Sequence, residues 1–172
     1  VRLPPQPREA GDLNCSWLIL RTEHSKEQYV ERQIANMGYA SWCPLEVRFH
    51  RIDGSSPQGR HRRPRVWDEP LLRTVVFAAV PMAVHGLLHS IDGFDHLQRP
   101  TPLSDPYTVP DEQIDIFRGM VDQENAMRRR MVHRQQIGKK GNRSIKVKGF
   151  GEHALSILME ELFGIERLQE AA

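Results

Sequence analysis

The hydrophobic pattern of the chain opens with a strand followed by a helix. Trp17 to Thr22 form a nearly continuous apolar run of strand length, which predicts a buried strand. The next apolar positions recur at helical spacing and form one stripe: Val30, Ile34 and Met37. Four polar side chains of this segment are expected to face water: Lys26, Glu27, Glu31 and Arg32. A strand and an amphipathic helix therefore form the first predicted unit.

Short signals mark both ends of this helix. Ser25 and Gln28 have the three-residue spacing of a capping box, in which the two side chains satisfy free N–H groups at a helix start. Gly38 suits the other end, because glycine readily adopts the left-handed conformation that closes many helices. We therefore expect Ser25 to be the N-cap and Gly38 to end the helix.

Two further strands are predicted, with a long loop between them. Residues 45–50 alternate between apolar and polar, so one face is expected to be solvated, Glu46 included. Residues 53–65 have the Gly, Pro, Ser and Arg content of a loop. Pro70 to Val80 is an apolar run interrupted only by Arg73-Thr74, and it is predicted to be the central strand. The simplest arrangement pairs these two strands as a hairpin with a basic tip.

Helical and extended patterns alternate in the remainder. After Pro81, an apolar helical face is traced by Val80, Val84, Leu87 or Leu88, and Ile91. Residues 94–97 are predicted to form a short last strand. A helix capped by Thr108 or Asp111 follows, with its apolar positions at Ile114, Phe117 and Val121. Gly138 to Gly141 is expected to break its continuation.

The order of these elements predicts an α+β fold, a sandwich in which an antiparallel four-stranded sheet is flanked by about three helices. Residues 1–14 are expected to be a flexible arm and residues 15–126 the folded domain. Residues 127–172 are interpreted as a basic linker and C-terminal tail, for which an apolar stripe at helical spacing predicts a short helix.

Composition describes a soluble globular protein. The chain has 172 residues, of which 39% are hydrophobic and 27% charged, and one domain with an arm is expected at this length. No apolar stretch approaches the roughly 20 residues that cross a bilayer, and the Pro-rich start lacks the apolar core of a signal peptide. A cytoplasmic protein with no membrane partner is therefore expected. Cys15 and Cys43 are expected to be reduced thiols, with a disulfide between them as the alternative.

The net charge of +2 conceals two basic blocks. Residues 51–75 contain six arginines against three acidic residues, and residues 118–148 contain ten Lys or Arg against Asp122 and Glu124. The segments between and after them are acidic. Such segregation favours binding of a polyanion at the two basic blocks, while the rest of the protein surface does not attract polyanions.

Signals for enzymatic chemistry are weak. His85 and His89 are four residues apart on a predicted helix, but no third metal ligand is close in sequence. Cys43 lacks a neighbour that would activate a thiol, and Gly149-Phe-Gly151 is too short for a phosphate-binding loop. Asp92, Asp95 and Asp105 have no spacing that would gather them around a divalent ion. A non-enzyme without a metal or cofactor is predicted.

Six motifs in this order resemble the N-terminal domain of the NusG family of transcription elongation factors. They are the Trp-led strand 16–22, the Lys-Glu opening of the first helix, Tyr39 to Pro44 before the second strand, the Arg-containing hairpin, Pro70-Leu-Leu-Arg-Thr-Val-Val-Phe77 in place of Pro-Leu-Phe-Pro-Gly-Tyr-Val-Phe, and Val109 to Ile114. Arg73-Thr74 stands where the family has Pro-Gly. The family's C-terminal KOW barrel has a Gly-Pro-Phe signature, which is missing here. For residues 127–172 the resemblance therefore implies a degenerate remnant of such a barrel as the alternative to a short helix.

The resemblance implies a protein that binds RNA polymerase across the clamp and suppresses pausing and termination, in the cytoplasm of a bacterium or of a phage-infected host. The implied partners are the clamp helices of the largest subunit, the opposite jaw, upstream or non-template DNA or nascent RNA, and other elongation factors. Carried over by position, the polymerase-binding residues are Trp17, Leu71, Leu72, Arg73, Thr74 and Phe117.

The two basic blocks are interpreted as nucleic-acid contacts. Their candidate residues are Arg60, His61, Arg62, Arg63, Arg65, Arg128, Arg129, Arg130, Arg134, Lys139, Lys140, Arg143, Lys146 and Lys148. Arginine and lysine bind phosphates without reading sequence. The alternative function is a stand-alone RNA- or DNA-binding α/β module. Against it, the alternating strand displays Glu46, Arg48 and His50 rather than the stacked aromatic residues of single-strand binders.

Overall fold

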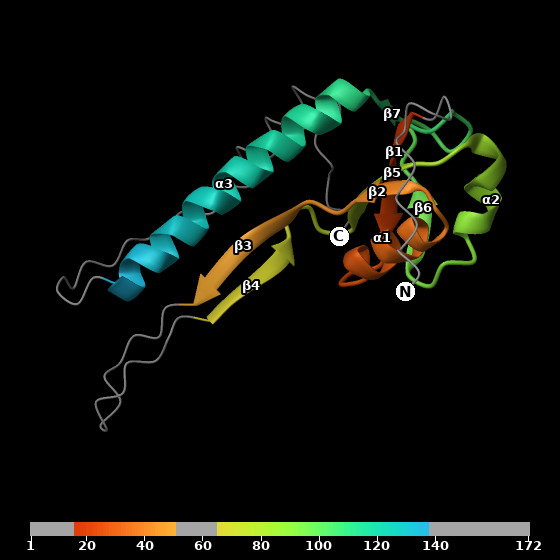
Figure 1. Ribbon diagram of the computed structural model, residues 1–172. Helices are drawn as coiled ribbons and strands as arrows, with labels where there is room; N and C mark the ends of the chain where they lie inside the picture. The colour runs from red at the N-terminus through yellow and green to blue at the C-terminus, as the bar shows by residue number, and fades with distance from the viewer. Residues whose placement is uncertain (1–15, 51–64, 138–172) are drawn as a thin grey trace, which may run out of the picture. The chain divides into compact units, whose positions relative to one another are not determined.

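The structure is a computed structural model that describes residues 16–50 and 65–137 (Figure 1). The chain divides into two compact units, residues 1–136 and 137–172, and the fold described below is that of the first. It is a mixed α+β structure with antiparallel sheets and helices, as predicted. No helix within the described ranges combines the length and apolar character needed to cross a membrane.

The larger sheet has five strands rather than the predicted four. β1 (Trp17–Thr22) lies at its centre and pairs antiparallel with β5 (Val75–Ala79), β6 (Phe94–Leu97) and β7 (Thr108–Val109). β2 (Ala40–Trp42) pairs with the other side of β5. The prediction missed β2 and β7 because strands of three and two residues are too short to show an alternating pattern.

A second sheet contains only β3 (Leu45–His50) and β4 (Arg65–Pro70), paired so that Val47 lies opposite Asp68. The prediction of one strand over Pro70–Val80 is therefore wrong. β4 ends at Pro70, a turn follows, and β5 then pairs with β1 so that Phe77 lies opposite Ile19. The sequence did not predict this turn, because residues 71–79 contain neither Gly nor Pro, the residues that usually mark turns.

Thr74 explains how the chain turns there. Its φ is 60°, the left-handed conformation that L-residues rarely adopt. Its N–H donates to Glu27 Oε1 at 2.7 Å, and its carbonyl accepts from the N–H of Thr22 at 3.0 Å. At the start of the turn, Leu71 N–H donates to the Pro44 carbonyl at 2.8 Å. Contacts from three parts of the chain thus fix the turn.

The first helix, α1 (Glu27–Asn36), starts differently from the prediction. Lys26 is its N-cap and makes no side-chain capping bond, while Ser25 adopts a φ of 66°. The predicted capping box is therefore wrong. Glu27 is also buried rather than solvated, because its carboxylate binds the Thr74 turn. The role of Gly38 is confirmed: the helix ends just before it, and its φ is 87°.

The other helices are shorter or longer than their patterns suggested. The predicted helix after Pro81 is a 3₁₀ turn, η2 (Met82–Val84), followed by the four-residue α2 (His85–Leu88). Leu88 is buried and Leu87 is exposed. α3 (Asp111–Ile137) starts near the predicted position, but Asp111 is its first residue rather than its cap, because the N–H groups of Gln113 and Ile114 donate to the Pro110 carbonyl. The other predicted cap, Thr108, belongs to β7.

Alternate residues of β1 and β5 form the core on both faces of the larger sheet. On one face, Leu18, Leu20, Val76 and Ala78 belong to a cluster that includes Val30 and Ile34 of α1 and Leu88 of α2. On the other face, Ile19 and Phe77 are fully buried, and Phe77 contacts Phe117 of α3. The predicted central position of this apolar strand is thus correct for Val75–Ala79 alone.

α3 also runs beside the β3–β4 hairpin (Figure 1). Asn125 receives a hydrogen bond from Val47 N–H at 2.8 Å and donates one to the Leu45 carbonyl at 2.7 Å. Arg128 donates to the Val47 carbonyl at 3.2 Å. Because β4 pairs with the opposite edge of β3, these two side chains satisfy backbone groups that a further strand would otherwise bind.

Candidate interaction surfaces

The turn after β4 brings four of the predicted polymerase-binding residues together. Arg73 is exposed at the turn, and Leu71 and Thr74 are half-buried. Leu72 is buried, with 8% of its surface exposed, and therefore packs inward. The surface that a partner can reach at this turn is provided mainly by Arg73 and Leu71.

Trp17 and Phe117, the other two predicted residues, are almost completely buried. They belong to an aromatic cluster that we define as Trp17, Trp42, Phe77 and Phe117. Trp42 stacks on Phe77 with ring centroids 5.6 Å apart and meets Phe117 edge-on at 5.2 Å. The cluster lies where β2, β5 and α3 meet.

Arg118 covers the exposed side of this cluster. Its guanidinium carbon lies 4.8 Å from the Trp17 ring centroid and 5.2 Å from that of Trp42, within the range of cation–π attraction. Trp17 Nε1 donates to Asp111 Oδ1, so the first turn of α3 is tied to β1. Sequence reasoning missed Trp42 and Arg118. Trp42 sits beside Cys43-Pro44 in a stretch without periodicity, and nothing local predicts that Arg118 lies between two indole rings.

A hollow of about 520 Å³ adjoins the cluster, between α1, β2, β3 and α3. Apolar and polar groups share its lining: Gln28, Glu31, Arg32, Trp42, Cys43, Leu45, Val121, Asp122 and Asn125. Burial, and then the nearby carboxylates of Glu27 and Glu31, raise the pKa of the Cys43 thiol to about 12. The thiol is therefore protonated near neutral pH, which removes it as a nucleophile.

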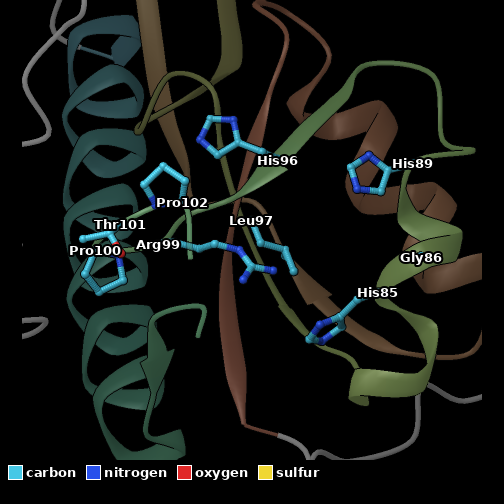
Figure 2. A pocket seen from close by; sticks show the side chains of 9 residues that line it. All are labelled: His85, Gly86, His89, His96, Leu97, Arg99, Pro100, Thr101 and Pro102. Atoms are coloured by element: carbon cyan, nitrogen blue, oxygen red, sulfur yellow. The ribbon is translucent and has the colours of Figure 1, made fainter. Parts of the chain in front are cut away.

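A second hollow, of about 630 Å³, lies between α2, β6 and the segment that follows β6 (Figure 2). Its lining consists of His85, Gly86, His89, His96, Leu97, Arg99, Pro100, Thr101 and Pro102. Within the described part of the chain, no group of three or more His, Cys, Asp or Glu could hold a metal ion. His85 and His89 share the lining of this pocket.

The basic residues predicted to bind nucleic acid fall into different environments. Arg128 is buried, pairs with Glu46 at 3.1 Å and with Glu124 at 2.9 Å, and is therefore not available to a phosphate. The burial of Arg128 does not favour its predicted role as a nucleic-acid contact, because only 3% of its surface is exposed. Its partner Glu46 is likewise buried rather than solvated.

Arg129 and Arg130 are exposed on α3, and Arg129 lies 3.4 Å from Asp68. Arg65 belongs to β4 and Arg134 to α3, but their side chains lie outside the described residues. The remaining predicted contacts lie outside them entirely: Arg60, His61, Arg62, Arg63, Lys139, Lys140, Arg143, Lys146 and Lys148. Cys15 also lies outside them, and Cys43 is a free thiol.

No known protein family matches this chain, and no curated protein matches it. The candidate surfaces are therefore judged on their own geometry.

Proposed function

We propose that the protein is a NusG-like transcription elongation factor that binds RNA polymerase across its clamp and suppresses pausing and termination. The observation that carries the proposal is the backbone of Thr74. The resemblance aligns this residue with the glycine of the family's Pro-Gly, and Thr74 has a φ of 60°. A glycine-type turn without glycine supports a shared backbone shape at this position.

The surroundings of the turn support the same proposal. Two residues of the motifs that carry the resemblance lie on the larger sheet, Trp17 on β1 and Phe77 on β5. Phe117 of α3, which the resemblance implies by position, packs against Phe77. Trp17 and Phe117 are buried, so they support the contact surface from behind. The proposed polymerase contacts are Arg73 and Leu71 at the turn, together with Arg118 and Trp42 at the aromatic cluster. Trp17 of that cluster lies opposite Ala79, at the other end of β5 from the turn. Aromatic and arginine side chains are enriched among residues that dominate binding energy.

Such a factor needs no chemical step. Binding that favours the closed clamp shifts the polymerase population away from paused and open states. The exposed Arg129 and Arg130 are proposed to contact upstream DNA or nascent RNA, together with the basic residues outside the described ranges.

A binding assay with purified core RNA polymerase tests the proposal. Lysates and proteins are treated with nuclease, and the affinity of the full chain is compared with that of Arg73→Glu and Arg118→Glu. Each variant is expected to weaken binding roughly tenfold or more, since a charge reversal at a binding surface costs several kcal/mol. Arg130→Glu makes the same charge change at an exposed position on α3 and is expected to retain binding. Equal affinity of all four proteins would contradict the proposed surface.

Transcription on a template with an intrinsic terminator gives the functional readout. The full chain is expected to increase read-through, and Arg73→Glu is expected to abolish the increase while leaving the protein folded. Read-through that does not respond to the chain would remove the antitermination part of the proposal.

One observation favours the alternative of a stand-alone nucleic-acid-binding module. Trp67 on β4 is 39% exposed and lies directly opposite the exposed Arg48 on β3. An indole beside a guanidinium is an arrangement on which single-stranded bases stack. The nuclease treatment separates the two functions: capture of polymerase that disappears after treatment favours the module, and capture that persists favours the elongation factor.

A further inference from the structure

The pocket in Figure 2 has a lining whose charge is of one sign. Of its nine lining residues, Arg99 is a permanent cation, three are histidines and none is acidic. The Asp95 carboxylate lies 3.1 Å from His96 Nδ1, but Asp95 does not line the pocket. A hollow lined in this way attracts an anion.

Two polar side chains of the lining, His85 and Arg99, are arranged as expected for a ligand-binding site. The Nε2 atom of His85 is buried and has no hydrogen-bond partner among the described residues. Buried polar atoms are normally paired, so an unpaired one calls for an explanation such as a missing ligand. Figure 2 shows the side chains of His85 and Arg99 extending toward the middle of the pocket from different elements.

The pocket wall is held in place before any ligand binds. Arg99 NH1 donates to the Ser104 carbonyl at 2.7 Å, and the Ser104 N–H donates to the Thr101 carbonyl at 3.0 Å. Arg99 is exposed, and its other guanidinium donors have no hydrogen-bond partner within the described ranges. On the other side, the His89 ring packs edge-on against Phe94 with centroids 5.1 Å apart. Pre-positioned donors lower the entropy cost of binding.

The apolar part of the lining narrows the ligand class. Leu97, Pro100 and Pro102 offer apolar surface beside the cationic groups, and Gly86 leaves open space where a side chain would stand. A volume of about 630 Å³ lies within the range of small-molecule sites and exceeds what a bare inorganic anion fills. A ligand with a phosphate and a flat, largely apolar group matches both parts.

We propose that the pocket between α2, β6 and residues 99–102 binds the phosphate group of a nucleotide, either free or within a nucleic-acid strand. Arg99 supplies the paired donors that suit phosphate oxygens, and His85 supplies a donor from the opposite wall. The apolar residues cover the sugar or base. The inference does not rest on polymerase binding, because it concerns a different surface.

Imidazole NMR signals of the full-length protein test the proposal. A nucleoside 5′-monophosphate is titrated against the same nucleoside without phosphate, which isolates the contribution of the phosphate. The monophosphate is expected to move the signals of His85, His89 and His96 and to bind at least roughly tenfold more tightly than the nucleoside. The signal of His24, exposed and outside the pocket, is expected to stay in place.

Two variants locate the site, and a further probe identifies the source of the phosphate. Arg99→Gln, at an exposed position, and His85→Gln are each expected to weaken monophosphate binding roughly tenfold, and His24→Gln is expected to leave it unchanged. Movement of the same three signals by a 5′-hydroxyl oligonucleotide assigns the site to a strand. Movement by the monophosphate alone assigns it to a free nucleotide. Equal binding of nucleoside and monophosphate, or unchanged binding by both pocket variants, overturns the proposal.

Discussion

At Thr74, a β-branched residue holds a backbone conformation that ordinarily belongs to glycine. The left-handed conformation costs a non-glycine residue roughly 1–2 kcal/mol. The hydrogen bonds to Glu27 and Thr22 hold the residue there in spite of this cost. The turn that separates β4 from β5 is therefore maintained by its surroundings rather than by its own sequence.

Thr74→Gly is expected to stabilise the protein by up to about 1 kcal/mol, since relief of the backbone strain exceeds the entropy cost of glycine, about 0.5–1 kcal/mol. Urea unfolding measures the change. Thr74→Ala keeps a Cβ atom and hence the strain, so it is expected to show no such gain. Equal stability of the Gly and Ala variants would show that strain at this residue is negligible.

Cys43 illustrates how burial decides reactivity. Its pKa is raised from 9.0 to about 12, so the folded state keeps a proton that the unfolded chain releases between these values. The unfolded state then binds fewer protons, and stability falls as the pH rises through this window. A Cys15→Ser variant leaves Cys43 as the single thiol. Alkylation of Cys43 at pH 8 is expected to be slow in buffer and fast in urea, and mass spectrometry measures both rates. Rapid alkylation of the folded protein would contradict the burial of this thiol.

At the level of single residues, sequence reasoning failed where burial depended on distant partners. Glu27 and Glu46 were expected in water, yet both are buried. Glu27 binds a backbone N–H 47 residues away, and Glu46 pairs with Arg128 on α3. The alternation of apolar and polar residues within one element cannot predict such distant partners, because it depends on that element alone.

Among the elements, those with a clear period were predictable and those defined by tertiary contacts were not. β1, α1, β6 and the start of α3 follow from their apolar patterns. The Pro70–Val80 run was read as one strand, because a left-handed threonine gives no signal in a sequence. Residues 40–42 form the strand β2 because they pair with the free edge of β5.

α3 stabilises the β3–β4 hairpin through a buried ion pair. The side chains of Glu46 and Arg128 are each 4% exposed, and their charged atoms lie 3.1 Å apart. Arg128→Ala leaves a buried carboxylate with fewer partners and is expected to cost about 3 kcal/mol in unfolding free energy, the lower end for a broken buried pair, because Arg48 also contacts Glu46. Thermal or urea unfolding measures the loss.

Two comparisons isolate the buried pair. Arg129 lies on the same helix as Arg128, and its pair with Asp68 of β4 is exposed. Arg129→Ala is expected to lower the unfolding free energy by less than about 1 kcal/mol. Glu46→Gln combined with Arg128→Met removes both charges and is expected to be more stable than Arg128→Ala alone. If the double variant is as unstable as Arg128→Ala, the unpaired charge of Glu46 is not the cause of the lost stability.

In the described unit as a whole, stability is expected to concentrate in β1 and β5. β1 pairs with β5, β6 and β7, and β5 pairs with β1 and β2, whereas β4 pairs with β3 alone among the described strands. Amides of β1 and β5 are therefore expected to exchange with deuterium most slowly, and those of β4 faster. Hydrogen-exchange mass spectrometry measures this order. Equal protection of β4 and β5 would show that the hairpin unfolds only with the sheet.

The candidate surface was only partly predictable at this scale. Trp17 and Phe117, which the resemblance implies, both lie in the region of the aromatic cluster, although both side chains are buried. Trp42 and Arg118 complete the region, and only the folded sheet brings them to it. Of the pocket proposed to bind phosphate, the sequence indicated only His85 and His89, which lie four residues apart on one predicted helix. His96 and Arg99 gave no signal, because they come from β6 and the segment after it.

Asn125 has a consequence for how copies of the protein behave toward one another. An uncovered strand edge is a template on which a second chain can pair, and such edges promote aggregation. By binding Leu45 and Val47, the amide of Asn125 occupies part of the edge of β3 that faces away from β4. Loss of this amide would leave the Val47 N–H and the Leu45 carbonyl unpaired, and a strand from a second copy could then bind them. A helix far along the chain thus protects part of a strand edge from self-association.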